Sequence, residues 1–270
     1  MNGRRVIKKA TRTLFITIFW IGLFVGVGIG TYHLTLTYYK STGQYASSTS
    51  DNANTIVKAT TDDVAVNAIF AVDGNDGKVK HLLLEIFHSK KGKFNFLTIP
   101  TDSQYNMSKE LYASINKDNP NVPQIMTWED LPQYFSQITT YQYASMILEE
   151  SLGIHISFYT LMSETTFQDY FEEAQATSLD GFNDTRGFTL SEATRNRMKG
   201  LTTSLQMEKE LAVYYTKIQS NLSLSRRNIY LSAYQKADYE GIGVYTLSIA
   251  KDTKQITTED RAYLRKLVED

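Results

Sequence analysis

Few side chains in this sequence have the types and spacing that chemistry requires. Cysteine is absent, which excludes disulfides, thiolate metal sites and cysteine nucleophiles. The four histidines stand at positions 33, 81, 88 and 155, without the spacing of a metal-binding motif. His81 and His88 lie on predicted strands, where a structural histidine is a commoner interpretation than a ligand.

The remaining candidates are carboxylates and guanidinium groups, and each also has a structural interpretation. Asp102 follows a Pro-Thr dipeptide, so it is either the cap of a turn or a ligand-binding carboxylate. Arg195 and Arg197 are two positions apart on a predicted helix, so they do not share one face and at least one is expected to be a surface charge. Asp73 begins an Asp-Gly turn, where a structural role is the commoner one.

Charge separates the first 40 residues from the rest of the chain. They hold six of the 28 basic residues and none of the 29 acidic ones, so the remainder has 22 basic and 29 acidic side chains and a formal charge of −7. An acidic remainder argues against a nucleic-acid-binding surface, and we expect no nucleic-acid partner.

An uncharged run, LFITIFWIGLFVGVGIG, occupies residues 14–30, and no charge follows before Lys40. About 20 helical residues span the hydrocarbon core of a bilayer, so the run is long enough to cross a membrane. Five basic residues precede it and the first acid is Asp51, which places the N-terminus in the cytoplasm and the following chain outside. We therefore predict a basic cytoplasmic tail at 1–13 and a transmembrane helix at 14–36, in a single-pass protein of the cell membrane.

A cleaved signal peptide and a buried core helix are the two alternatives to a membrane anchor. A signal-peptide core is usually about 7–15 apolar residues followed by a small-x-small cleavage site, whereas this run is longer and continues as YHLTLTYYK. A buried helix of a soluble core is less favoured, because every face of the segment is apolar. Polar, small residues then predict a flexible extracytoplasmic stalk at 37–60, and residues 61–270 are long enough for one globular domain.

Hydrophobic patterning predicts the elements of that domain. Strands are expected at 64–72, 79–88, 93–99, 155–162, 228–234 and 242–250. Helices are expected from a Thr127/Asp130 capping box, at 141–152, at 164–175, from a Thr189/Glu192 capping box, along a face of Met207, Leu211, Tyr214 and Ile218, and at 258–269. Residues 103–126 and 181–187 are predicted to be mostly loop. The order predicts an α/β fold, with a mixed β-sheet flanked by helices on both faces.

Several segments, taken in order, resemble the LytR-CpsA-Psr domain. VNAIFAVDG (66–74) is similar to its opening N-I-L-L-L-G-x-D strand, and HLLLEIFHSKKGKFNFLTIPTDS (81–103) to its D-T-I-M-L…K-K-V…L-S-I-P-R-D-T hairpin. ASMILEESLGIHISFYTLMSETTFQDYF (144–171) resembles the V-E-x-L-L-G-I-x-I-D-Y-Y…F stretch, and LSEATRNR (190–197) the A-x-x-x-R-x-R helix. The resemblance covers about residues 64–215.

The resemblance implies a membrane-anchored cell-envelope protein, as found mostly in Gram-positive bacteria. Enzymes of this family transfer glycopolymers from polyprenyl-pyrophosphate carriers to peptidoglycan or similar acceptors. It also implies that arginines and an acid-bound Mg²⁺ hold the pyrophosphate while an apolar pocket takes the lipid. The implied partners are the cytoplasmic membrane, a polyprenyl-phosphate-linked glycan or cell-wall polymer, and a paralogous protein of the same family.

Carried over residue by residue, the family site is incomplete in this chain. The arginine of the P-R-D motif is Thr101, which offers one hydrogen bond but no charge. Asp102 remains as candidate catalytic acid and, with Asp73, as candidate metal ligand. The acid that opens the D-T-I-M-L strand falls near Lys80 or His81.

The arginine-rich part of the family site is kept only in part. Arg195 and Arg197 match R-x-R and are the candidate phosphate ligands, together with Thr101. In the following segment, LTTSLQMEKE, only Gln206 and Lys209 are partial substitutes for the family's D-x-x-R-x-x-R-Q.

Three hypotheses follow from these matches and departures. The first is a glycan-binding envelope protein with reduced or no phosphotransferase activity. The second is an active glycopolymer phosphotransferase that uses Asp102, Arg195 and Arg197. The third is an extracytoplasmic module that keeps the fold and binds protein.

Overall fold

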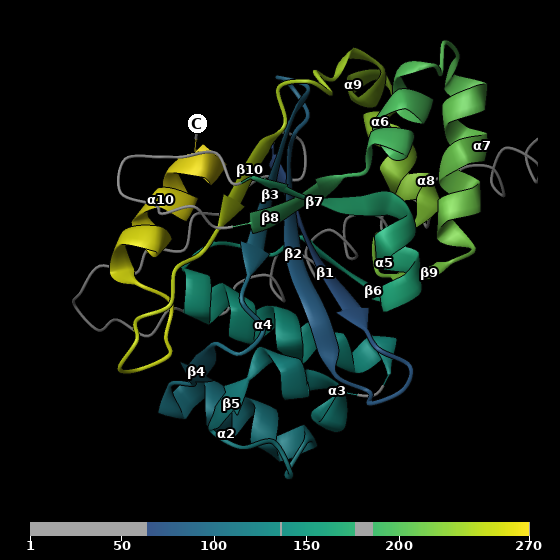
Figure 1. The fold of residues 1–270 in the computed structure, drawn as a ribbon. Coiled ribbons are helices and arrows are strands. Elements are labelled where there is room, and N and C mark those ends of the chain that lie inside the picture. Colours follow the sequence, from purple (N-terminus) through teal and green to yellow (C-terminus); the bar gives the residue numbers. More distant parts are fainter. Residues whose placement is uncertain (1–63, 136, 176–185, 270) are drawn as a thin grey trace, which may run out of the picture. The chain divides into compact units, whose positions relative to one another are not determined.

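The computed structural model describes residues 64–135, 137–175 and 186–269. A six-stranded mixed sheet forms the centre of this region, in the order β10-β3-β2-β1-β6-β9 (Figure 1). Its strands are β1 Val64–Val72, β2 Val79–His88, β3 Lys93–Ile99, β6 Phe158–Ser163, β9 Ile218–Ser220 and β10 Gly243–Thr246. The pairs β1–β6 and β10–β3 are parallel, and the other three are antiparallel.

The three central strands agree with the prediction at both ends. Ala68 of β1 lies opposite Leu84 of β2, which lies opposite Leu97 of β3, and all three side chains are fully buried. Apolar runs without alternation indicate strands that are covered on both faces. Strands β1, β2 and β3 are indeed covered on both faces.

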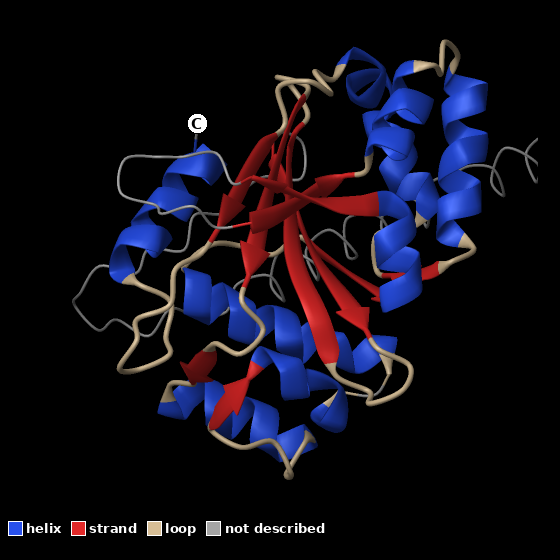
Figure 2. Cartoon of the chain, in the orientation of Figure 1, coloured by secondary structure: helices blue, strands red, loops and turns tan. Residues whose placement is uncertain are grey.

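Helices cover both faces of the sheet, as Figure 2 shows, so the predicted fold class of the domain is confirmed. One face packs against α2 Lys109–Asp118, α3 Leu131–Tyr134, α4 Tyr141–Leu152, α10 Thr258–Glu269 and the ribbon of β4 Gln104–Asn106 and β5 Ile125–Thr127. The other packs against α5 Glu164–Tyr170, α6 Glu192–Lys199, α7 Ser204–Tyr215, α8 Leu224–Arg227, α9 Leu231–Lys236 and the ribbon of β7 Phe171–Gln175 and β8 Arg186–Leu190. Short 3-10 turns are η1 Trp128–Asp130, η2 Ile138–Thr140 and η3 Asn228–Tyr230.

Two predicted helices are confirmed together with their sequence signals. Helix α4 ends at Gly153, whose φ of 69° lies in the left-handed region that glycine adopts without strain. Helix α10 occupies the predicted closing segment and buries Leu264 and Val268 in the core.

Residues 103–126 are not mostly loop, because they contain β4, α2 and the start of β5. The Ser108 side chain begins α2 by accepting a hydrogen bond from the backbone of Leu111. Ile115 is fully buried and Leu111 and Tyr112 pack beside it, so the helix has an apolar face, but its other side chains are mostly polar and its average composition is that of a loop.

The predicted strand at 228–234 is wrong, because this segment is helical. Tyr230 and Tyr234 are four positions apart, and both enter the core from one helical face. The predicted helix at 164–175 ends at Tyr170, because Phe171 and the following residues pair with β8.

Other element ends differ by a few residues. The first turn after Thr127 is the 3-10 turn η1, and only the short α3 follows it. Ser191, rather than Thr189, caps α6 by accepting from the backbone of Thr194. Ile218 lies on β9 beyond the end of α7. Strands β6 and β10 are shorter than their predicted ranges, 155–162 and 242–250.

Within the described ranges, no helix has the length and apolarity needed to cross a membrane. The predicted tail at 1–13, transmembrane helix at 14–36 and stalk at 37–60 lie outside those ranges, as does most of the predicted loop at 181–187.

Candidate functional site

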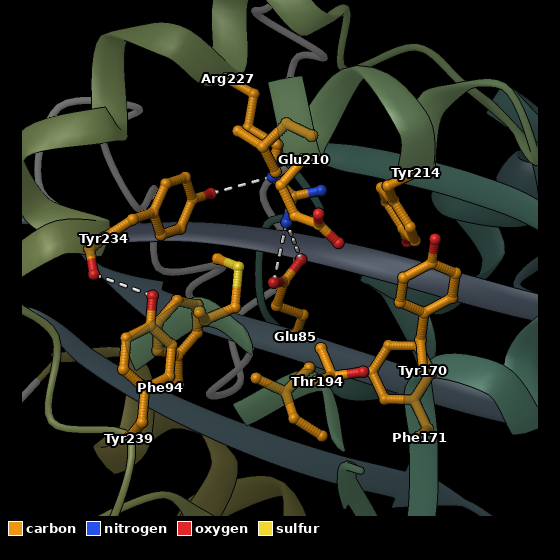
Figure 3. A pocket seen from close by; sticks show the side chains of 13 residues that line it. Glu85, Phe94, Tyr170, Phe171, Thr194, Glu210, Tyr214, Arg227, Tyr234 and Tyr239 are labelled. Atoms are coloured by element: carbon orange, nitrogen blue, oxygen red, sulfur yellow. Dashed lines mark hydrogen bonds and ion pairs between the residues drawn. The ribbon is translucent and has the colours of Figure 1, made fainter. Parts of the chain in front are cut away.

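A pocket lies between strands β2 and β3 and the elements from α5 to α9 (Figure 3). Its cavity volume is about 70 Å³. The lining is mainly aromatic and aliphatic, and consists of Glu85, Phe94, Tyr170, Phe171, Leu190, Thr194, Met198, Glu210, Leu211, Tyr214, Arg227, Tyr234 and Tyr239. Ligand pockets commonly combine apolar walls with a few placed polar groups, so this is the candidate binding site.

The inner end of the pocket is a buried ion pair. Arg227 Nη2 lies 2.9 and 2.8 Å from the two carboxylate oxygens of Glu85, and its Nε donates to Tyr234 Oη at 3.0 Å. Glu85 is 8% exposed and Arg227 is 6% exposed. Burial is the largest single influence and disfavours the charge of Arg227, but the combined attraction of Glu85 and of the neighbouring tyrosines Tyr234, Tyr215 and Tyr214 outweighs it. The pKa of Arg227 therefore lies above its usual value.

The sheet itself provides the second support for Glu85. Asn67 stands directly opposite Glu85 in the β1–β2 register, and its Nδ2 donates to Glu85 Oε2 at 3.1 Å. Thr160 of β6 donates in turn to Asn67 Oδ1 at 3.0 Å. Three strands and two helices therefore share one network, which commits Arg227 to internal partners and leaves the apolar walls for a ligand.

The tyrosines of the pocket contribute surface and hydrogen bonds rather than charge. Burial raises the pKa of the Tyr214 and Tyr234 hydroxyls above the usual value, so both are neutral near pH 7. The Tyr234 ring stacks on Phe87 at a centroid distance of 4.6 Å, within a larger group of aromatic rings.

Helix α6 carries both candidate phosphate ligands, and each is paired with a carboxylate. Arg195 Nη2 lies 2.9 Å from Glu172 Oε1 on β7, and Arg197 Nη1 lies 2.5 Å from Glu210 Oε1 on α7. Glu210 lines the pocket, whereas its partner Arg197 is not one of the lining residues. The two arginines therefore turn toward different elements, which fits their separation by two helical positions.

Thr101 and Asp102 follow the far end of β3 from the pocket residue Phe94. The five steps from Phe94 to the last residue of β3 span about 16 Å at 3.3 Å per residue. The Thr101 carbonyl accepts a hydrogen bond from the Glu129 backbone, and the Asp102 side chain is exposed. Among the contacts of the described residues, none joins Thr101 or Asp102 to Arg195 or Arg197.

Gln206 acts as a helix cap. Its Oε1 accepts from the backbone amides of Thr202 and Thr203 at 3.1 and 3.2 Å, which completes a capping box at the start of α7. Its carbonyl oxygen is therefore already used at the helix start.

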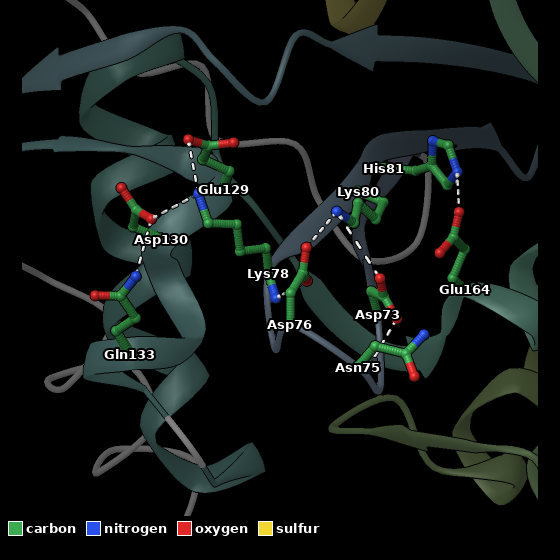
Figure 4. A network of polar contacts seen from close by, with 10 residues as sticks. All are labelled: Asp73, Asn75, Asp76, Lys78, Lys80, His81, Glu129, Asp130, Gln133 and Glu164. Atoms are coloured by element: carbon green, nitrogen blue, oxygen red, sulfur yellow. Dashed lines mark hydrogen bonds and ion pairs between the residues drawn. The ribbon is translucent and has the colours of Figure 1, made fainter.

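Asp73 belongs to a network of charges at the β1–β2 turn (Figure 4). Its Oδ1 accepts from the Asn75 backbone at 2.8 Å, and its Oδ2 lies 3.8 Å from Lys80 Nζ. Lys80 Nζ also lies 2.5 Å from Asp76 Oδ2. The hydrogen bond to Asp76 raises the pKa of Lys80, and the same bond lowers the pKa of Asp76.

The two strand histidines are held by the surrounding fold. The His81 ring packs on Phe167 and Phe188 at centroid distances of 4.7 and 4.6 Å, and its Nε2 lies 3.7 Å from Glu164 Oε1. Burial lowers the pKa of His81 and outweighs the attraction of Glu164. His88 is buried, and its Nε2 lies 2.9 Å from the Leu267 carbonyl.

The residues that the family resemblance assigns to Mg²⁺ do not form a fitting ligand set. Asp73 faces the ammonium of Lys80, and Asp102 is exposed at a different turn. Within the described ranges, no three or more His, Asp or Glu side chains form a group that could hold a metal ion. Magnesium usually needs near-octahedral oxygen ligands, which these residues do not supply.

Glu85 and Arg227 were missed as functional candidates. Glu85 is the only charge in the apolar run of β2, and a buried acid requires a partner, so its position was a usable signal. Its partner is 142 positions away, and no local pattern in the sequence identifies it.

No protein-family model and no curated protein matches the sequence. Among solved structures, the chain is similar to protein gbs0355 from Streptococcus agalactiae, with 12% identity, 77% of this chain and 89% of that chain covered, and a TM-score of 0.53. TagV from B. subtilis aligns with 10% identity, 77% and 96% coverage, and a TM-score of 0.51. The LytR-CPS2A-psr family protein YwtF (TagT) with bound octaprenyl pyrophosphate lipid aligns with 12% identity, 80% and 94% coverage, and a TM-score of 0.46.

Protein gbs0355 and TagV share the fold of this chain, and the family resemblance noted in the sequence is confirmed at the level of the fold alone. At these identities the comparison establishes the fold, and the site rests on the residues described above.

Proposed function

We propose that this chain is a membrane-anchored cell-envelope protein that binds a polyprenyl-(pyro)phosphate-linked or wall glycan, with reduced or no transferase activity. The observation that carries the proposal is the apolar, aromatic pocket on a LytR-CpsA-Psr-like fold, with an arginine paired to its lining residue Glu210. The predicted topology at residues 1–36 places this domain outside the cell, where such glycans are found.

The pocket matches the two chemically different parts of a lipid phosphate. Its apolar walls provide favourable burial for part of an isoprenoid chain, at about 25 cal/mol per Å² of apolar surface. Arg197, which is paired with the lining residue Glu210, provides a charge-assisted donor for the phosphate. Because Glu210 already pairs with Arg197, a phosphate has to displace a carboxylate, which weakens its binding.

Weak or absent transfer follows from the other end of the sheet. Thr101 supplies no fixed positive charge, and loss of one such donor commonly lowers a rate about 10²–10³-fold. Asp102 is exposed, and no contact among the described residues joins it to Arg195 or Arg197, so these three candidates do not converge on one reacting atom. No step of the proposal uses a bound metal.

Titration of a fluorescent polyprenyl phosphate into the full chain in nanodiscs tests the binding. We expect Arg197→Ala to weaken binding roughly tenfold or more, since a hydrogen bond to a charged group contributes about 1.5–3 kcal/mol. Glu210→Gln is the matched opposite change, because it releases Arg197, and we expect it to strengthen binding. Equal affinities for the wild type and both variants would show that Arg197 takes no part.

The transferase part of the proposal needs a separate measurement. We expect the purified chain to transfer or hydrolyse polyprenyl pyrophosphate far more slowly than relatives that have an arginine in place of Thr101. If slow turnover is measurable, Thr101→Arg should raise it. A wild-type rate equal to that of those relatives would refute this part.

A second function, binding of a protein, is favoured by a different observation. The cavity of about 70 Å³ is small beside the roughly 300–1,000 Å³ of usual ligand pockets, and its inner end is closed by Glu85 and Arg227. Absence of lipid-phosphate binding in the titration, for the wild type and for Glu210→Gln, would make the protein-binding module the leading hypothesis.

A further inference from the structure

We propose that Lys80 takes the place of a divalent cation at the β1–β2 turn, so that ligand binding by this chain is independent of Mg²⁺ and Ca²⁺. This inference deepens the proposed function and rests on it only where ligand binding is concerned. The part that concerns cations stands on the geometry of the turn alone (Figure 4).

Two carboxylates of the turn are arranged around one ammonium. The Oδ1 atoms of Asp73 and Asp76 are used locally, because they accept from the backbone amides of Asn75 and Lys78 at 2.8 and 2.9 Å. The two Oδ2 atoms both face Lys80 Nζ, at 3.8 and 2.5 Å. One positive charge therefore occupies the position where two carboxylates would otherwise repel each other.

The strand fixes the ammonium in that position. Lys80 is the second residue of β2, and the turn Asp73–Gly77 brings both acids back beside it, closed by hydrogen bonds from Gly77 N to Asp73 O and from Asp73 N to Lys78 O. A lysine ammonium is charged throughout the physiological range. An internal cation of this kind is present at every concentration of free metal.

The neighbouring charges reach this turn only in part. Lys78 Nζ lies 3.3 Å from Glu129 and 3.7 Å from Asp130, and it also attracts Asp76 more weakly. The carboxylate of Glu164 lies near both Lys80 and His81. Removal of Lys80 takes away the ammonium that both Oδ2 atoms face, and leaves two carboxylates whose oxygen atoms are the kind of ligand that Ca²⁺ and Mg²⁺ prefer.

The thermal midpoint of the full chain in nanodiscs, with and without divalent cation, tests the proposal without any ligand. Each chloride salt is compared with NaCl at equal ionic strength, because screening alone changes surface pairs. We expect no shift for the wild type with 10 mM Ca²⁺ or Mg²⁺. We expect Lys80→Ala to gain a cation-dependent rise of about 2–4 °C, from binding to the folded state only.

Three further variants make the test specific. Lys80→Arg keeps the charge and should gain nothing. Lys217→Ala removes an ammonium that faces a single carboxylate, Asp169 at 2.9 Å, and should also gain nothing. Adding Asp73→Asn to Lys80→Ala should abolish the gain.

Two outcomes of the thermal comparison would overturn the proposal. A cation-dependent rise in the wild type would overturn the proposal, because a metal would then bind beside Lys80. No rise in Lys80→Ala would also overturn it, because the two carboxylates would then not form a cation site. The fluorescent lipid-phosphate titration, repeated with EDTA and with Mg²⁺, should give equal affinities. A chain that binds no lipid phosphate contradicts the proposed function, while the thermal comparison still decides the role of Lys80.

Discussion

Two groups of ion pairs in this molecule use the same chemistry in opposite surroundings. Glu85 and Arg227 lie at the inner end of the pocket, where both are more than nine-tenths buried (Figure 3). Lys78 and Lys80 pair with acids at the β1–β2 turn, where the side chains are between 18% and 41% exposed (Figure 4). Burial therefore decides whether an ion pair affects the free energy of unfolding strongly or only sets the local charge.

The physical reason is the cost of removing a charge from water. A buried ion loses several kcal/mol of solvation, which its partner and its hydrogen bonds must replace. Exposed pairs lose little solvation and gain little, typically about 0–1 kcal/mol each. We therefore expect mutations in the two groups to differ several-fold in their effect on the free energy of unfolding.

The largest effect is expected for Glu85→Gln. The substitution keeps the size of the side chain but leaves the guanidinium of Arg227 buried without a counter-charge. We expect the free energy of unfolding to fall by about 3–5 kcal/mol, measured by urea denaturation. A loss below about 1 kcal/mol would show that the pocket is wetter than the structure indicates.

The matched control removes both charges together. Glu85→Leu with Arg227→Met replaces the pair by apolar groups of similar size, so no unpaired charge is left. Such replacements are often neutral or stabilising, and we expect this double variant to be far more stable than Glu85→Gln. If both variants lose the same stability, the loss comes from packing rather than from charge.

A smaller effect in the same network is expected for Tyr234→Phe. The hydroxyl of Tyr234 accepts from Arg227 Nε at 3.0 Å, whereas the aromatic ring and its stacking on Phe87 are kept by the substitution. A hydrogen bond to a charged group contributes about 1.5–3 kcal/mol, so the free energy of unfolding measured by urea denaturation should fall by about that amount. Tyr230→Phe, on the same helical face, serves as the comparison, because its hydroxyl is not a partner of Arg227.

The parts of the fold that sequence reasoning found are those whose signal is local. The apolar runs of β1, β2 and β3 indicate buried strands by composition alone. Gly153 marks the end of α4 because the backbone there has a left-handed conformation, which glycine adopts without strain. Helix α2 was missed because its polar composition, beside Asn, Asp and two prolines, was given more weight than the helical spacing of Leu111, Tyr112 and Ile115.

The candidate site was harder to predict because its contacts join distant positions. Arg195 and Arg197 were identified as charges, but their partners, Glu172 and Glu210, come from β7 and α7, 23 and 13 positions away. Glu85 was visible as an isolated charge in an apolar strand. Its partner Arg227 is the last residue of α8, and the residues that follow, 228–234, were predicted to be a strand. The sequence therefore did not indicate toward which part of the fold the Arg227 side chain points.

The dependence of stability on pH provides a third comparison, at a group of intermediate burial. His81 has a pKa lowered by burial, so the unfolded chain binds its proton more readily than the folded chain does. Stability is therefore unaffected above the unfolded pKa of about 6.5 and is lost as the pH falls below it. The carboxylates of Glu164 and Glu173 act to raise the pKa of His81, whereas the ammonium of Lys80 acts in the same direction as burial, and the net pKa is lowered.

We expect His81→Phe to remove this acid-side loss, because the new ring still packs on Phe167 and Phe188 but does not titrate. Unfolding curves measured between pH 7 and pH 5 should converge or cross, with the variant gaining relative to the wild type as the pH falls. Parallel curves over this range would mean that His81 stays in contact with water in both states.

The smallest effect is expected at the exposed pair. Glu129 Oε1 lies 3.3 Å from Lys78 Nζ, and both side chains are more than one-third exposed. Glu129→Gln should therefore lower the free energy of unfolding by less than about 1 kcal/mol, and the difference should shrink further in 1 M NaCl, where the Debye length is about 3 Å. Glu85→Gln gives the contrast, because salt cannot reach the buried pair and its large loss should persist. A salt-independent loss at Glu129 as large as that at Glu85 would remove the distinction between the two groups.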